Sequence, residues 1–292
     1  MNKNDVNDSI CINITRRCNL TCPECYVYKH INTLNRMNKM DLSFSEIRSI
    51  TNMLPYKEVY LTGGEPFLHP EIQEIINYFY GLGKKIYIAT NALLLDECRM
   101  RFLEGKNISL LVSLRDTHRE VFAIVNKLIA MKIDVECYYL PNNNDEASIL
   151  SDFIQSCPLV TDYKILYNSK NSPTSQQWFS CLEKIYFEIK DKVKDKNIIV
   201  ELGYLPFNHP IAQEARRGAI DRVNISTEGS LYSCPLLLNQ GIAEKCTPNT
   251  CPVISQHVED DCFKSICCFL ETTLNKALQI YLYGNRIMNQ RK

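Results

Sequence analysis

Strand-like and helix-like segments alternate along most of this chain. Runs with strand character cover residues 10–14, 58–61, 85–89, 108–113, 133–140 and 163–167. A first helix is expected to begin at a Ser43–Glu46 capping box. Helical periodicity recurs over residues 70–82, 94–104, 117–131, 146–156 and 178–194. Strands that are each followed by a helix predict parallel β/α units with right-handed crossovers. We therefore expect an α/β fold: a partial six-unit β/α barrel of the TIM type with a small C-terminal cysteine-rich domain.

Candidate functional residues follow each of the first four predicted strands. In order they are Cys18, Cys22 and Cys25; Gly63, Gly64, Glu65 and Pro66; Thr90 and Asn91; and Ser113, Leu114, Arg115 and Asp116. In β/α barrels the reacting groups lie at the C-terminal ends of the strands. All four groups are therefore expected to face one cavity, with Arg16, Arg17, Arg115, Tyr138, Tyr139 and Tyr167 as further candidates to line it.

The spacing Cys18-x3-Cys22-x2-Cys25 offers three thiols on one short loop and no fourth. Closed zinc sites and fully ligated iron-sulfur clusters use four ligands, so this loop predicts a metal position left open for a small molecule. The alternatives are half of a zinc site or a redox pair. Gly63 and Gly64 permit close backbone approach to a ligand. The alternative is that this segment is only a turn before a helix.

The cysteine count favours metal or redox chemistry, because the chain has 14 cysteines but is neither small nor visibly secreted. Five of them, Cys11, Cys98, Cys137, Cys157 and Cys181, are expected to fill the core. Lys plus Arg and Asp plus Glu both number 33, so no global field favours nucleic acid or an anionic membrane. No apolar run approaches the roughly 18 residues of a membrane span, and we expect a cytoplasmic protein.

A second domain is expected beyond the β/α units. The boundary is placed so that residues 1–199 form the partial barrel and 200–292 the cysteine-rich domain. That domain begins with a strand at 198–202 and a hairpin of strands 223–226 and 230–232 around a Glu228-Gly229 turn. Six cysteines follow the hairpin: Cys234, Cys246, Cys251, Cys262, Cys267 and Cys268.

Together, the Cys18-x3-Cys22-x2-Cys25 loop and the Gly63-Gly64-Glu65-Pro66 turn resemble the radical S-adenosylmethionine superfamily. The resemblance implies a [4Fe-4S] cluster on the three cysteines, whose open iron is chelated by S-adenosylmethionine. It also implies that the turn at Gly63, Gly64, Glu65 and Pro66 receives the methionyl amine. Asn91 and Ser113 are expected to contact the methionine and ribose, with ordinary capping as the alternative.

Two positions depart from the family pattern. Glu24 occupies the site before the third cysteine, where an aromatic residue is common, and Arg115 precedes Asp116 after the fourth strand. The second departure leaves open which carboxylate meets the ribose.

The C-terminal cysteines resemble the auxiliary-cluster extension called SPASM, or its shorter twitch form. The gap from Cys234 to Gly241 is shorter than usual there, and a later Cys-x2-Cys pair is missing. One auxiliary [4Fe-4S] cluster is expected, with Cys234, Cys246, Cys251 and Cys262 as ligands, and structural zinc is the alternative. Cys267 or Cys268 could replace a ligand or return a hydrogen atom to a substrate radical.

The reaction that the resemblance implies is reductive cleavage of S-adenosylmethionine to a 5′-deoxyadenosyl radical, which abstracts hydrogen from substrate. A ribosomally made peptide is the first expectation, modified by epimerisation, thioether formation or carbon-carbon crosslinking. A small-molecule dehydrogenase or cofactor-biosynthesis enzyme is the alternative, and a non-catalytic iron-sulfur or zinc protein is the alternative of another class. Expected partners are a reductant such as flavodoxin or ferredoxin and a separate leader-peptide-binding protein, because only about nine residues precede the first strand.

Overall fold

The computed structural model describes residues 9–22, 25, 39–114, 119–139, 147–166, 175–201, 222–229, 231–232, 271–273, 275 and 278–279. Its strands are β1 Ser9–Thr15, β2 Glu58–Gly63, β3 Lys85–Thr90, β4 Ile108–Leu114, β5 Asp134–Tyr139, β6 Asp162–Ile165, β7 Asn197–Glu201, β8 Arg222–Ile225, β9 Leu231–Tyr232 and β10 Glu271–Thr273. Its helices are α2 Phe44–Thr51, η1 Pro66–Leu68, α3 Ile72–Gly81, α4 Glu97–Leu103, α5 Glu120–Ala130, α6 Ala147–Ser156 and α7 Ser175–Ile189.

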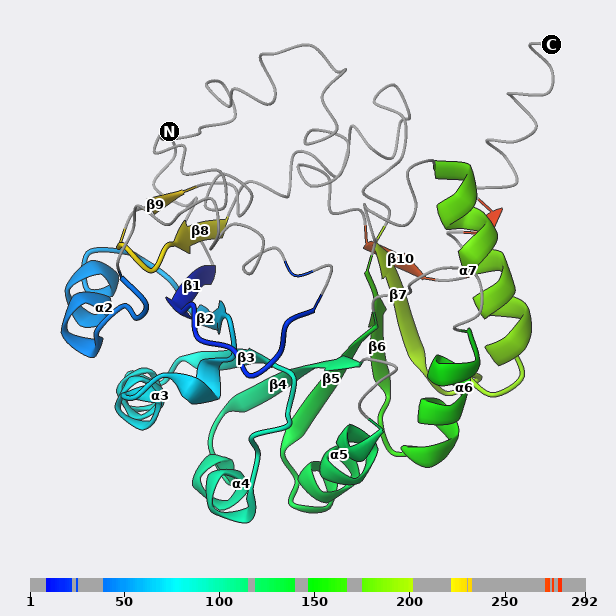
Figure 1. Cartoon of the computed structure of the whole chain (residues 1–292), viewed down its shortest axis with the longest axis horizontal. Helices are drawn as coiled ribbons and strands as arrows, with labels where there is room; N and C mark the ends of the chain where they lie inside the picture. The colour runs from blue at the N-terminus through cyan, green and yellow to red at the C-terminus, as the bar shows by residue number, and fades with distance from the viewer. Residues whose placement is uncertain are drawn as a thin grey trace, which may run out of the picture.

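The described strands form one sheet in the order β10-β7-β6-β5-β4-β3-β2-β1-β8-β9. Neighbours from β8 through β1 to β7 pair in parallel, whereas β9 and β10 pair antiparallel at the two edges. Figure 1 shows this sheet curved, with α2 to α7 on its outer side. The partial β/α barrel predicted from the sequence is confirmed.

The parallel sheet is larger than the six strands expected. β7 continues it beyond β6, and β8 pairs with β1 on the other side, so eight strands run parallel among the described residues. Backbone groups at the edge of a sheet need partners, and β8 supplies them to β1. The sheet therefore reaches past residue 199, while the auxiliary-cluster domain at 200–292 stays a prediction.

In several strands, alternate residues face the core and the inside of the curve. Ile10, Ile12 and Ile14 of β1 are fully buried, whereas Cys11 and Asn13 on the opposite face are partly exposed. The same period of two recurs in β2, β3 and β5. Buried residues of one face pack with the helices into one hydrophobic core.

The scattered cysteines divide by position. Cys137 and Cys157 are buried as expected, and Cys11 and Cys181 are partly buried. Cys98 is exposed, which corrects the expectation that it fills the core. It lies in the first turn of α4, where the buried residues are Met100 and Leu103.

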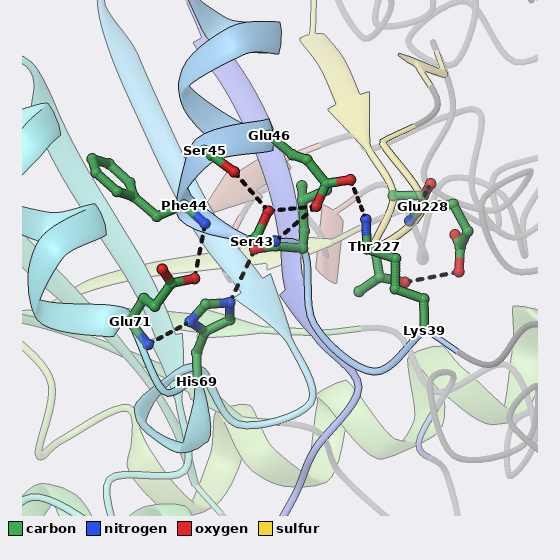
Figure 2. Close-up of polar contacts among 11 residues, drawn as sticks. Lys39, Ser43, Phe44, Ser45, Glu46, His69, Glu71, Thr227 and Glu228 are labelled. Carbon is green, nitrogen blue, oxygen red and sulfur yellow. Dashed lines mark hydrogen bonds and ion pairs between the residues drawn. The ribbon is translucent and has the colours of Figure 1, made fainter.

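Hydrogen bonds and an ion pair stabilise the start of α2 (Figure 2). The Glu46 carboxylate accepts the Ser43 backbone N–H at 3.1 Å, which confirms the predicted capping box. Lys39 Nζ lies 2.5 Å from Glu46 Oε1, and the hydrogen bonds from Lys39 and Ser43 lower the pKa of Glu46 to about 2. The buried His69 ring lies between the Leu42 carbonyl and the Glu71 N–H, at 3.0 Å from each.

A buried hydroxyl in β6 allows the energetic cost of an unpaired polar group in the core to be tested. Tyr163 is 1% exposed, and its hydroxyl has no hydrogen-bond partner among the described residues. Burial raises the pKa of this phenol. Because a buried polar group without a partner costs free energy, Tyr163→Phe is expected to leave the free energy of unfolding unchanged or raise it by up to about 1 kcal/mol.

Thr90→Val is the matched control, because the buried Thr90 hydroxyl donates to Glu65 at 2.8 Å and accepts the Ala92 N–H at 2.9 Å. It is expected to lower the free energy of unfolding by about 1–3 kcal/mol, measured as a shift in the urea midpoint at unchanged slope. A Tyr163→Phe variant that loses as much stability as Thr90→Val would contradict the assignment.

Candidate active site

The C-terminal ends of β1, β2 and β3 lie side by side at one edge of the sheet. These strands pair in parallel, with Thr15 next to Gly63 and Leu61 next to Ile88. The cysteine loop therefore lies beside the Gly63–Pro66 turn, as the order of strands predicted. Hydrogen bonds bring this turn and Asn91 into contact with the segment Thr15–Asn19, and Thr90 joins them through Glu65.

Hydrogen bonds within the loop after β1 involve all three cysteines. The Cys25 N–H donates to the Cys22 carbonyl at 3.0 Å, and Cys18 Sγ accepts the Leu20 N–H at 3.4 Å. Burial raises the pKa of Cys18, and the nearby charges of Glu65, Cys25 and Cys22 raise it further.

Thiolate sulfur is the ligand type that iron-sulfur clusters use. Across the described residues, no three His, Cys, Asp or Glu side chains converge as ligands of a single metal ion. A cluster of several irons spreads its thiolates more widely than one ion, which draws its sulfur ligands to about 2.3 Å. The donor set of this loop is therefore of the kind that fits a cluster.

Gly63 and Gly64 are required by the close approach of two backbone segments. The Gly64 N–H donates to the Thr15 carbonyl and the Glu65 N–H to the Arg17 carbonyl, both at 2.7 Å. A Cβ at Gly63 would lie 2.2 Å from the Thr15 oxygen, and one at Gly64 would lie 2.1 Å from the Arg17 oxygen. Gly63 also has φ of 132°, which L side chains rarely adopt. In the structure the glycines thus admit the backbone of the cysteine loop itself.

Glu65 is a buried carboxylate that joins the ends of β2 and β3. It is 1% exposed and accepts the Thr90 hydroxyl at 2.8 Å, the Asn91 N–H at 2.9 Å and the Phe67 N–H at 3.2 Å. Burial raises its pKa, while the hydrogen bonds from Asn91, Thr90 and Phe67 act in the opposite direction. Its predicted contact with an ammonium stays a prediction, and the structure adds a second role, the fastening of two strand ends.

Three further predicted residues lie around this carboxylate. Asn91 Nδ2 donates to Asn19 Oδ1 of the cysteine loop at 2.8 Å, and Asn91 Oδ1 accepts the Leu93 N–H at 3.0 Å. Pro66 is buried at the first position of η1. Ser113 is half-buried near the end of β4. Asn91 thus contacts the loop and caps a turn as well.

Ser113 begins a row of inward-facing residues across three strands. It pairs in register with Tyr138 of β5, which pairs with Lys164 of β6, and all three are half-buried. Lys164 Nζ lies 5.6 Å from the centre of the Tyr138 ring. Tyr139 is fully buried on the opposite face, which corrects the expectation that it lines the cavity. Sequence reasoning missed Lys164, although the alternation of β6 could have revealed it.

The two arginines before Cys18 are engaged in ion pairs. Arg16 pairs with Glu228 in the turn between β8 and β9, with only 10% of its side chain exposed. Arg17 Nε lies 2.8 Å from Asp41 Oδ2, and half of its side chain is exposed. Both pairs fasten the start of the cysteine loop to neighbouring segments, a role that the sequence did not indicate.

Several predicted residues lie outside the described residues. They are Glu24, Arg115, Asp116, Tyr167, Cys234, Cys246, Cys251, Cys262, Cys267 and Cys268. The predictions made for them stay predictions. In the part of the chain that is described, no helix is both long and apolar enough to cross a membrane.

A three-cysteine loop that follows the first strand of a partial β/α barrel, beside a glycine turn, defines a class of protein. Residues 12–146 match the family model described as the radical SAM superfamily. This range contains the three cysteines, the Gly63–Pro66 turn, Asn91 and Ser113. This segment is therefore similar to the radical SAM superfamily, in agreement with the resemblance of its motifs.

Three curated relatives match parts of the chain. It is 33% identical over 92 residues to 7-carboxy-7-deazaguanine synthase of Aquifex aeolicus, covering 32% of this chain and 40% of that protein. It is 29% identical over 104 residues to the antilisterial bacteriocin subtilosin biosynthesis protein AlbA of Bacillus subtilis, covering 35% and 22%. It is 32% identical over 130 residues to GTP 3',8-cyclase of Listeria welshimeri, covering 42% and 38%. The chain therefore spans well under half the length of each.

One solved structure is similar over most of the chain. SuiB of Streptococcus suis, bound to the precursor peptide SuiA, has a TM-score of 0.66 at 14% identity. The match covers 90% of this chain and 70% of that one. It is a likeness of the fold.

The glycine turn leads to a sharp stability test. Gly64→Ala is expected to lower the free energy of unfolding by about 2 kcal/mol or more, because the new Cβ would collide with backbone atoms that cannot rotate away. Gly81→Ala is the matched control, because Gly81 ends α3 and has no atom within 4 Å of the added carbon. It is expected to be neutral or to stabilise by up to about 1 kcal/mol. Equal urea midpoints for the two variants would contradict this account of the turn.

Proposed function

We propose that this chain is a radical SAM enzyme whose substrate is a ribosomally made peptide. The observation that carries the catalytic part is the contact between the cysteine loop and the Gly63–Asn91 region at the ends of β1, β2 and β3. Three thiols without a fourth, next to a turn with close backbone packing and a buried carboxylate, form a site that holds a cluster and presents it to a small ligand.

The proposed roles follow the positions of the residues. Cys18, Cys22 and Cys25 hold the [4Fe-4S] cluster, and Gly63, Gly64, Glu65, Pro66, Asn91 and Ser113 form the S-adenosylmethionine site. When bound, the cluster and S-adenosylmethionine supply the one-electron chemistry that produces a 5′-deoxyadenosyl radical. Tyr138 and Lys164, next to Ser113 in register, are placed to orient the substrate.

The C-terminal cysteines extend the proposal. Cys234, Cys246, Cys251 and Cys262 are the proposed ligands of one auxiliary [4Fe-4S] cluster, with structural zinc as the alternative. Cys267 or Cys268 is the proposed hydrogen donor to a substrate radical. An external reductant such as flavodoxin or ferredoxin would supply the electron, and a separate protein would bind a leader peptide.

Two similarities support a peptide substrate. SuiB, whose fold this chain shares, is bound to a precursor peptide, and AlbA takes part in the biosynthesis of a bacteriocin. A small-molecule substrate is the second candidate, because GTP 3',8-cyclase and 7-carboxy-7-deazaguanine synthase also match parts of the chain.

Formation of 5′-deoxyadenosine separates the enzyme from a non-catalytic iron-sulfur or zinc protein. After anaerobic reconstitution with iron and sulfide, reduction in the presence of S-adenosylmethionine is expected to release 5′-deoxyadenosine. Cys18→Ala, Cys22→Ala and Cys25→Ala are each expected to abolish it, because an open cluster needs all three thiolates. Cys98→Ala is the matched control and should retain it, since Cys98 is exposed on α4. Release that survives loss of the loop thiols would defeat the proposal.

The substrate class is tested with two probes under the same conditions. One is a synthetic peptide encoded by a short open reading frame next to the gene, and the other is GTP. The peptide is expected to raise the rate of 5′-deoxyadenosine formation and to change in mass. If GTP is consumed in step with 5′-deoxyadenosine and the peptide is not, the small-molecule alternative replaces the peptide.

A further inference from the structure

Both chain neighbours of Cys18 are hydrogen-bonded to residues that follow β2 and β3. On one side, the Arg17 carbonyl accepts the Glu65 N–H at 2.7 Å. On the other side, Asn19 Oδ1 accepts Asn91 Nδ2 at 2.8 Å. Asn91 also donates its backbone N–H to Glu65 Oε2 at 2.9 Å. The contacts thus form a closed ring through residues 17, 65, 91 and 19, which we call the Cys18 clamp.

A backbone contact of Asn91 determines which of its amide atoms faces Asn19. Asn91 Oδ1 accepts the Leu93 N–H at 3.0 Å, so the amide must present its Nδ2 to Asn19. The Asn91 backbone is held in turn by the buried Glu65 carboxylate. Asn91 is therefore anchored at its main chain and at its amide oxygen before it reaches the loop. Asn19, which is exposed, contributes only an acceptor.

Among the described contacts, the other two cysteines are joined to each other. The Cys25 N–H donates to the Cys22 carbonyl at 3.0 Å, which closes a local turn within the loop. The contacts on either side of Cys18 lead to Glu65, after β2, and to Asn91, after β3.

We propose that Asn91 is a positioning residue that holds Cys18 ready to receive the cluster. The inference rests on the proposed function in one respect, that Cys18 is a cluster ligand. Ordering a loop costs backbone conformational entropy, and a segment that is already fixed avoids that cost when it binds. With Cys18 held in advance, cluster binding avoids the cost of ordering this ligand. Loss of the clamp therefore weakens retention of the cluster.

The test uses substitutions at both ends of one hydrogen bond. Asn91→Asp keeps the acceptor for Leu93 but turns an oxygen toward Asn19, so the bond is lost. Asn19→Ala removes the acceptor from an exposed position, where the change leaves the core untouched. Asn19→Asp keeps the acceptor and adds the same charge as Asn91→Asp, so it is the matched control for charge near the thiols.

The first readout is the rate at which the reconstituted chain loses iron to a ferrous chelator under anaerobic conditions. Asn91→Asp and Asn19→Ala are expected to lose iron about fivefold faster than the wild type, the change that one hydrogen bond of ordinary net strength supplies. Asn19→Asp is expected to remain within about twofold of the wild type on the same grounds. Equal rates for Asn19→Ala and Asn19→Asp would overturn the proposal.

The second readout is hydrogen exchange of the loop amides in the cluster-free full chain. Asn91→Asp and Asn19→Ala are expected to raise exchange at residues 17–22 and to leave the strands β1 to β4 protected. Unchanged loop exchange would overturn the clamp. Because this arm needs no cluster, it is independent of the proposed function: failure of the wild type to bind iron would defeat the cluster assignment alone.

Discussion

The contact between two backbones, Thr15 to Arg17 and Gly63 to Glu65, is the constraint on which the rest of the site depends. Hydrogen bonds of 2.7 Å join the segments at two points, and side-chain-free residues at 63 and 64 make that distance attainable. Because the first segment leads directly into Cys18, the turn after β2 determines where the cysteine loop begins. The Gly63–Pro66 turn and the start of the cysteine loop are consequently parts of one packed unit.

Glu65 extends this contact to the third strand. A carboxylate that is 1% exposed is costly to bury unless donors compensate it, and here two backbone N–H groups and the Thr90 hydroxyl do so. The cost makes the arrangement specific, because a neutral or shorter side chain would leave those donors without partners. Asn91 then carries the connection back to Asn19, so hydrogen bonds link the ends of β1, β2 and β3.

The other side of the loop is fastened by charge. Arg16 pairs with Glu228, which belongs to the turn after β8, while Arg17 pairs with Asp41 in the segment before α2. The pairing of β8 with β1 brings Glu228 within reach. A strand from beyond residue 200 thus helps to hold the loop that the first 25 residues supply. The auxiliary cysteines proposed after β9 follow directly from this hairpin in the chain.

The sequence by itself determined the class of fold, the three-cysteine loop and the glycine turn, because strand and helix periods and fixed cysteine spacing are local properties that short stretches display. It also located the capping box of α2 and the turn between β8 and β9. Tertiary structure alone decided that β8 joins β1, that Tyr139 is buried while Tyr138 and Lys164 face inward, and that Glu65, Asn91 and Asn19 form one ring. Those outcomes depend on which strands become neighbours and in which register, and partners 25 to 72 positions apart leave no periodic trace in the chain.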